Sequence, residues 1–144
     1  YIQQDSSVYD RDSCLIPADL IAFIKDTQPK KYKALQTQYG EQVDEKIIYR
    51  VSQELSKRKT LSVLREKVTD RGQKLDLVYF KPNHDKSPEH QEWYDKNRLT
   101  IIRQLKYSNK NNNSLDLVLF VNGLPVVTLE LKNALTGQYL LNAI

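Results

Sequence analysis

Three charged residues stand in or beside the most apolar part of the chain: Asp116, Glu130 and Lys132. Asp116 lies inside the apolar run 115–121, and the other two close the next run, in the spacing Asp-x13-Glu-x-Lys. An ionised side chain in such a place usually has a partner or holds a metal, because an unpaired buried charge is costly. The pattern is therefore a candidate for chemistry, and the competing interpretation is an ion pair at the end of a hairpin.

If the three side chains converge, the chemistry that follows is phosphodiester hydrolysis. Mg²⁺ favours one or two protein carboxylates together with waters and phosphate oxygens. Such a cation polarises the phosphate and lowers the pKa of a bound water, while an ammonium group positions the nucleophile and stabilises transition-state charge. On that condition Asp116, Glu130 and Lys132 would be catalytic, Asp116 and Glu130 would bind the metal, and the backbone carbonyl of Leu131 could also reach it.

The register of the predicted hairpin decides whether the two carboxylates meet. The pair Asn122-Gly123 is a strong turn signal. A two-residue turn makes the numbers of paired residues sum to 245, so Asp116 opposes Leu129 and Glu130 points to the other face. A three-residue loop with a glycine bulge gives 246 or 244 and places Asp116 opposite or diagonal to Glu130. The chemical interpretation therefore predicts a loop with an odd number of residues.

Hydrophobic spacing and breaker residues predict an α/β order of elements around this hairpin. Helices are expected from Pro17 to before Pro29, over 31–39 and over about 42–58, where the apolar residues form one stripe. Strands are expected at 74–80, 99–107, 115–121 and 125–132. The segments between and after them are expected to be a loop at 81–92, with a short helix at 91–96, a turn at 108–114 and a helix from 136. Run 115–121 is expected to be covered on both faces.

Composition limits the class of protein. The chain has 144 residues, 40% hydrophobic and 28% charged, which indicates one globular domain. No apolar run approaches the roughly 18 residues of a membrane span, and a single cysteine, Cys14, excludes an internal disulfide framework. A net charge of +4 permits a nucleic-acid partner without requiring one. We expect a fragment of a longer protein, with an N-terminal helical extension over 1–40 and a core over 41–144 that is incomplete at its C-terminal end.

The segments 97–108, 115–127 and 130–133, together with Leu-Val-Tyr-Phe-Lys-Pro at 77–82, carry a resemblance. Over residues 48–138 the chain resembles the N-terminal nuclease domain of the restriction (R) subunit of type I restriction–modification enzymes. The nuclease of that family belongs to the PD-(D/E)xK superfamily. The resemblance implies an α/β fold whose core is a helix, a three-strand mixed sheet with an antiparallel hairpin, a helix and a further strand.

The resemblance also implies a function. The implied protein is a type I site-specific deoxyribonuclease. This chain would be its Mg²⁺-dependent endonuclease part, which cuts double-stranded DNA within an ATP-dependent complex. Asp116 and Glu130 are then metal ligands and Lys132 is the third active-site residue. ATP would act only through motor domains absent from this chain, which has no phosphate-binding G-x-x-x-x-G-K-[ST] loop. The implied partners are DNA and the specificity and methyltransferase subunits, in a bacterial or archaeal cytoplasm.

Other residues carry weaker expectations. Candidates for phosphate contacts are Lys57, Arg58, Lys59, Arg103, Lys106 and Asn133, each of which competes with the interpretation of an ordinary solvated charge. Some superfamily members use a Glu on the first core helix, so Glu54 is a candidate accessory acid or else a solvated helix residue. Related nucleases carry Gln-x-x-x-Tyr after the lysine, but here Gln138 is followed by Asn142.

Two alternative functions remain open at this stage. One is a non-catalytic DNA-binding or scaffold module that keeps the fold alone. The other is a repair or junction-cleaving nuclease of the same superfamily.

Overall fold

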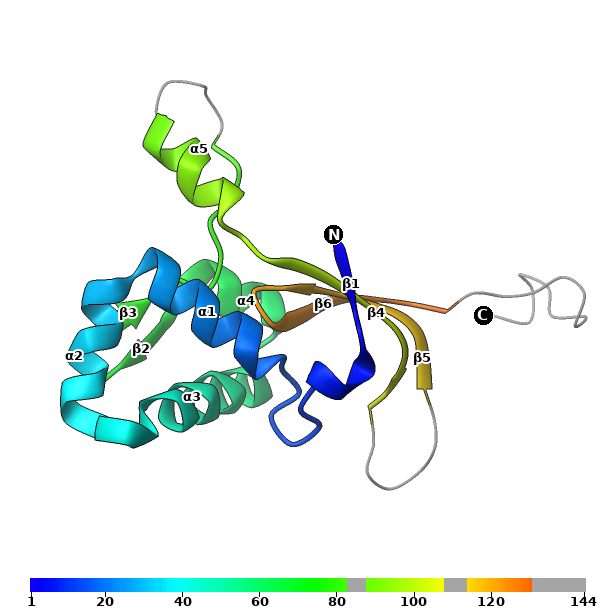
Figure 1. The fold of residues 1–144 in the computed structure, drawn as a ribbon, viewed down its shortest axis with the longest axis horizontal. Helices are drawn as coiled ribbons and strands as arrows, with labels where there is room; N and C mark the ends of the chain where they lie inside the picture. Colours follow the sequence, from blue (N-terminus) through cyan, green and yellow to red (C-terminus); the bar gives the residue numbers. More distant parts are fainter. Residues whose placement is uncertain (83–87, 108–113, 131–144) are drawn as a thin grey trace, which may run out of the picture.

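The computed structural model describes residues 1–82, 88–107 and 114–130. In this part of the chain a body of helices lies at one end and a four-stranded sheet extends from it, while the short helix α5 (Pro88–Asp95) projects from the body (Figure 1). The remaining elements are β1 (Ile2–Gln4), α1 (Pro17–Thr27), α2 (Pro29–Tyr39), α3 (Val43–Lys57), α4 (Thr60–Glu66), β2 (Val68–Asp70), β3 (Gln73–Leu75), β4 (Leu99–Lys106), β5 (Ser114–Val121) and β6 (Leu124–Leu129), with 3-10 turns at Ser6–Val8 and Gly40–Gln42.

The three helices predicted in the first half are confirmed, and their ends follow local chemistry. Pro17 and Pro29 occupy the first turns of α1 and α2, where a missing N–H costs nothing. Gly40 ends α2 with a φ of +65°, a conformation that favours glycine. In α3 the residues Val43, Ile47 and Val51 are buried at a spacing of four, as the predicted stripe requires.

The helices pack around one hydrophobic cluster, which we call the helical core. It joins α1, α2 and α3 to α4, β2, β3 and the start of β6, so residues 17–39 share their core with α3. The buried members of the helical core are Leu15, Leu20, Ile21, Phe23, Ile24, Leu35, Val43, Ile47, Val51, Val63, Leu64, Val68, Leu75, Leu77 and Leu124.

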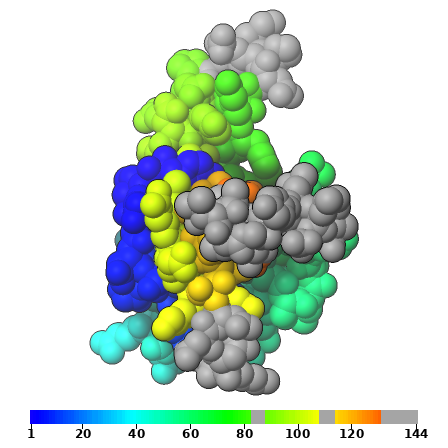
Figure 2. Space-filling view, turned by 90° about the vertical axis from the view of Figure 1, so that its right-hand side faces the viewer, coloured from blue at the N-terminus to red at the C-terminus, as the bar shows by residue number. Residues whose placement is uncertain are grey.

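The four-stranded sheet has the order β1-β4-β5-β6. Its β4–β5 and β5–β6 pairs are antiparallel, and β1 pairs in parallel with β4 through Ile2↔Thr100 to Gln4↔Ile102. Figure 2 shows the N-terminal residues beside β4 on this side of the molecule. The buried carboxylate of Asp19 in α1 accepts hydrogen bonds from Gln4 Nε2 at 3.1 Å and from Thr100 Oγ1 at 2.8 Å. A helix thus ties the N-terminal strand to the sheet, and this strand was not predicted.

A second cluster, the sheet core, lies against one face of β4 and β5. Its buried members are Ile16, Ile102, Leu105, Val118 and Phe120. On β5, Val118 and Phe120 are buried while Leu117 and Leu119 are only half-buried. Both faces of residues 115–121 are therefore covered, but unequally: none of these residues is exposed, while alternate side chains are buried and half-buried.

The predicted strand 74–80 is largely wrong. Only β3 is a strand there, and it pairs with β2 in a separate two-stranded sheet. Neither this small sheet nor the helix α4 was predicted from the sequence. Beyond β3 the backbone is bonded by side-chain amides. Gln28 pairs with both backbone groups of Asp76, Asn97 does the same with Tyr79, and Asn122 Nδ2 donates to the Leu77 carbonyl. These amides take the place of a neighbouring strand, which a local sequence pattern does not show.

The strands predicted at 99–107 and 115–121 are confirmed as β4 and β5, and the short helix predicted at 91–96 begins earlier, at Pro88. The strand predicted at 125–132 is β6 up to Leu129. The turn expected at 108–114 lies almost entirely outside the described residues, and the helix expected from 136 lies wholly outside them. No helix in the described part of the chain is both long enough and apolar enough to cross a membrane.

Candidate functional site

The turn between β5 and β6 has two residues. Val121 pairs with Leu124, and Asn122 and Gly123 between them have φ values of +50° and +84°, the left-handed conformations of a tight hairpin turn. The prediction of a loop with an odd number of residues is therefore wrong. The residue types Asn-Gly favour this turn on local grounds alone.

The extra residue needed by the site lies inside β6. Phe120 pairs with Pro125 and Leu119 pairs with Val127, so Val126 is an added residue on β6, a β-bulge. Below the bulge, paired numbers sum to 246, as in Leu117↔Leu129. Continued by one position past the end of β6 at Leu129, this register would set Asp116 opposite Glu130, the relation that the chemistry requires.

Asp116 lies on the wall of a hollow of about 460 Å³. The described residues that line this hollow are Arg103 and Gln104 from β4 and Asp116 and Leu117 from β5. Asp116 is half-buried, whereas Glu130, directly after β6, is exposed. The remaining members of the predicted site, Leu131, Lys132 and Asn133, lie outside the described residues. Of the three catalytic candidates, the structure describes Asp116 on β5 and Glu130 directly after β6.

The chemistry of this donor set fits a hard divalent cation. The half-buried carboxylate of Asp116 and the exposed carboxylate of Glu130 offer oxygen ligands and leave room for water. Within residues 1–82, 88–107 and 114–130, no group of three His, Cys, Asp or Glu side chains lies close enough to hold a metal. A cation held by these two carboxylates would keep waters among its ligands, as Mg²⁺ usually does.

Two of the weaker candidates are engaged inside the fold. The Glu54 carboxylate contacts Arg50 at 2.6 Å and Arg58 at 2.9 Å, and Arg58 also contacts Glu66 at 2.8 Å. The Glu54 side chain is only 14% exposed, so it is not a freely solvated helix residue. Arg58 also donates to the Lys67 carbonyl at 3.1 Å. This network joins α3 to α4 and accounts for both side chains as structural ion pairs.

The other basic candidates lie on the surface. Lys57 and Lys59 are exposed near the end of α3, and Arg103 and Lys106 are exposed on β4, with Arg103 in the hollow beside Asp116. The indole ring of Trp93 packs against the ring of Tyr79 at a centroid distance of 5.5 Å.

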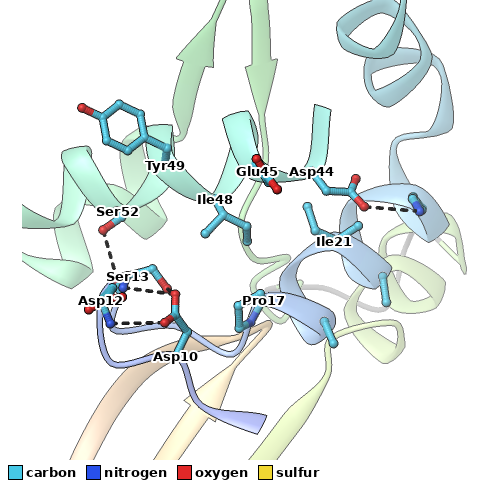
Figure 3. Close-up of a pocket in the computed structure, with 13 residues that line it drawn as sticks. Asp10, Asp12, Ser13, Pro17, Ile21, Asp44, Glu45, Ile48, Tyr49 and Ser52 are labelled. Atoms are coloured by element: carbon cyan, nitrogen blue, oxygen red, sulfur yellow. Dashed lines mark hydrogen bonds and ion pairs between the residues drawn. The ribbon is translucent and has the colours of Figure 1, made fainter. Parts of the chain in front are cut away.

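A separate hollow of about 810 Å³ lies on the helical body between α1, α3 and the turn that contains Asp10 and Ser13 (Figure 3). Its apolar wall includes Ile21 and Ile48. The Asp10 carboxylate on its rim accepts a hydrogen bond from Ser13 Oγ at 2.6 Å, which holds the pKa of Asp10 below 3.8. None of its lining residues belongs to the hollow beside Asp116. The candidate catalytic site is therefore the hollow beside Asp116.

One residue of this hollow, Gln104, was not singled out from the sequence. Its only distinctive property is a φ of +53° within a strand, and a glutamine carries no signal for that conformation.

No curated protein and no solved structure matches the chain. Residues 17–144 match the family model described as "Type I restriction enzyme R protein N terminus". The match starts at the first residue of α1 and includes both strands of the hairpin that carries Asp116 and Glu130. The chain therefore belongs to the type I restriction enzyme R protein family, as its N-terminal region.

Proposed function

We propose that this chain is the Mg²⁺-dependent endonuclease domain of a type I restriction enzyme R subunit, cutting DNA within an ATP-dependent complex. The observation that supports the proposal is the bulge at Val126, which shifts the β5–β6 pairing to a register that, continued past Leu129, would set Asp116 opposite Glu130. An ion pair closing the hairpin would not need two carboxylates there, because two like charges repel. A shared cation offsets that repulsion.

The residues of this chain would divide the work as follows. The carboxylates of Asp116 and Glu130 and the backbone carbonyl of Leu131 would hold Mg²⁺, which when bound polarises the scissile phosphate and lowers the pKa of a water. The Lys132 ammonium would orient the attacking water and stabilise negative charge that develops on the phosphate. This division leaves Glu54 without a catalytic role, because its carboxylate is engaged by Arg50 and Arg58.

Contacts to the DNA backbone would come from the basic side chains nearest the hollow. Arg103 lines the hollow itself and Lys106 follows on the same strand. Both are exposed and carry the charge that phosphate oxygens attract. Lys57, Lys59 and Asn133 remain further candidates, whereas Arg58 is already held by Glu54 and Glu66. ATP, the motor domains and the specificity and methyltransferase subunits would enter through the rest of the complex.

The test uses the full R subunit assembled with its specificity and methyltransferase subunits. Asp116→Asn and Lys132→Ala should each lower DNA cleavage by at least about 10²-fold, as the loss of a transition-state contact does. ATP hydrolysis should continue at the wild-type rate, because no residue of this site is assigned to it. Asp26→Asn, an exposed carboxylate on α1, is the charge-matched control. Wild-type cleavage by both site variants would contradict the proposal and favour a non-catalytic DNA-binding module.

A further inference from the structure

The ladder between β4 and β5 is interrupted at one position. Its pairs follow a single register from Leu99↔Val121 to Lys106↔Ser114, but Gln104 and Asp116, which face each other in that register, are not paired. Gln104 has a φ of +53°, in the left-handed region that non-glycine residues seldom adopt. The interruption therefore falls on the strand position of the candidate catalytic aspartate.

Burial shows what this interruption does to the side chains. Ile102 and Leu105 are three residues apart, so in a regular strand they would lie on opposite faces. Both are nevertheless buried in the sheet core. On β5, Val118 and Leu115 are also three apart, and both contact the same sheet core. On both strands, the side chains that face the sheet core therefore switch from one set of alternate residues to the other at Gln104 and Asp116.

The reversal exchanges apolar for polar side chains. In a regular strand, Asp116 would follow Phe120 and Val118 on the face of the sheet core. Here Leu105 and Leu115 contact that core instead, while Gln104 and Asp116 line the hollow together with Arg103 and Leu117. A carboxylate directed into an apolar core would be costly. A left-handed residue costs about 1–2 kcal/mol, and burial of two leucines offsets that strain.

We propose that Gln104 is a positioning residue for the nuclease reaction: its left-handed backbone turns Asp116 out of the sheet core and into the hollow beside Arg103. This inference rests on the proposed function and deepens it. The backbone conformation does the positioning, and the glutamine side chain is secondary, since among the described residues its Oε1 accepts one long, exposed hydrogen bond, of 3.4 Å, from Ser114 Oγ. The position should therefore tolerate residues that adopt the left-handed region and reject those that do not.

The test compares four variants of residue 104 in the full R subunit within its assembled complex. Gly and Asn adopt the left-handed region readily, Ala less so, and a β-branched Val least. Gln104→Gly and Gln104→Asn should therefore keep near wild-type cleavage. Gln104→Ala, which has an unbranched Cβ as glutamine has, should also keep it, whereas Gln104→Val should lose about 10²-fold, the cost of misplacing a reacting group by about an ångström.

A second readout separates positioning from general stability. The Mg²⁺ concentration for half-maximal cleavage should rise in the order Gly, Asn, Ala, Val. ATP hydrolysis by the same complexes should stay at the wild-type rate. Cleavage that does not follow left-handed tolerance, a Gly variant as impaired as Val, or an Ala variant impaired by loss of the glutamine side chain would overturn the proposal. If Val fails to assemble, loss of cleavage in the Gly or Asn variant still overturns it. Asp116→Asn is measured in parallel. Loss of cleavage there with a normal Val variant overturns only the role of Gln104, whereas wild-type cleavage by Asp116→Asn overturns the proposed function itself.

Discussion

The side-chain amide of Asn122 donates a 2.9 Å hydrogen bond to Oδ1 of Asn97. Asn122 is fully buried in the hairpin turn, and it also donates to the Leu77 carbonyl at 2.9 Å and accepts from the Arg98 N–H at 2.7 Å. Asn97 in turn bonds both backbone groups of Tyr79. The turn of the β5–β6 hairpin is therefore tied to the irregular segment after β3 through two asparagine side chains.

Substitutions of Asn122 should separate the contribution of its left-handed backbone from that of its side-chain hydrogen bonds. Asn122→Gly keeps the φ of +50° but removes three side-chain hydrogen bonds, and it should lower the free energy of unfolding by about 3 kcal/mol, since it leaves buried groups unpaired. Asn122→Asp keeps the acceptor for Arg98 but loses both donated bonds, and should be at least as destabilising. Urea denaturation measures both, and an unchanged midpoint for either variant would contradict the structural role.

Gly123 should not accept a side chain. A Cβ added there would lie 2.5 Å from the Ile16 carbonyl oxygen and 3.1 Å from the Leu20 nitrogen, at the start of α1. Gly123→Ala should therefore destabilise the fold by more than about 3 kcal/mol, because strain adds to the cost of a left-handed alanine. Gly72→Ala is the matched control, with a φ of +83° and nothing within 4 Å of the added Cβ, and should cost only about 1 kcal/mol. Equal losses in thermal unfolding would show that the contact with α1 is unimportant.

The Glu54→Gln variant tests whether Glu54 is structural or an accessory acid. The substitution removes the negative charge that faces Arg50 and Arg58, while Arg58 Nε is buried without a hydrogen-bond partner in the described part of the chain. We expect a loss of stability of about 1–3 kcal/mol with an unchanged Mg²⁺ dependence of cleavage. Normal stability combined with a loss of cleavage would instead assign Glu54 to the reaction.

Asp10 should make stability depend on acid pH. The hydroxyl of Ser13 and the N–H groups of Asp12 and Ser13 donate to its carboxylate and hold the pKa of Asp10 below 3.8 in the folded state. Because this pKa is lower than in the unfolded chain, the contribution is complete above pH 3.8 and is lost as the pH falls through the folded-state pKa. Asp10→Asn should therefore be less stable than the wild type at pH 7, and the difference should shrink below pH 3.8.

The Ser13→Ala variant provides the control for this titration. It removes the hydrogen bond that lowers the pKa of Asp10 most. In that background the effect of Asp10→Asn at pH 7 should be smaller. A stability difference between Asp10→Asn and the wild type that is independent of pH would show that the carboxylate does not act through its charge.

The predictions from sequence succeeded where local chemistry decides the structure. Pro17, Pro29 and Gly40 mark the ends of helices directly, and Asn122-Gly123 marks its turn. The need for one extra residue between Asp116 and Glu130 was also foreseen, but its position was wrong. Nothing in the type of Val126 distinguishes a bulged residue from an ordinary strand residue, and only its packing against the helical core does so.

The predictions failed where distant residues decide. The strand character of Leu77 and Tyr79 was overridden by Asn122 and Asn97, whose amides replace a strand partner. β1 depends on a partner at Thr100, so three residues near the start of the chain gave no local sign of pairing. The roles of Asp116, Glu130 and Lys132 stay predictions, because metal binding and cleavage are matters for experiment.

The parallel pairing of β1 with β4 has a consequence for biogenesis. When Ile2 leaves the ribosome its partner Thr100 has not yet been synthesised, and the hairpin that completes the sheet, through Leu129, emerges later still. Contacts between such distant parts of a chain slow folding. The helices can form early during translation, but the sheet that holds Asp116 can close only once nearly the whole region has been made.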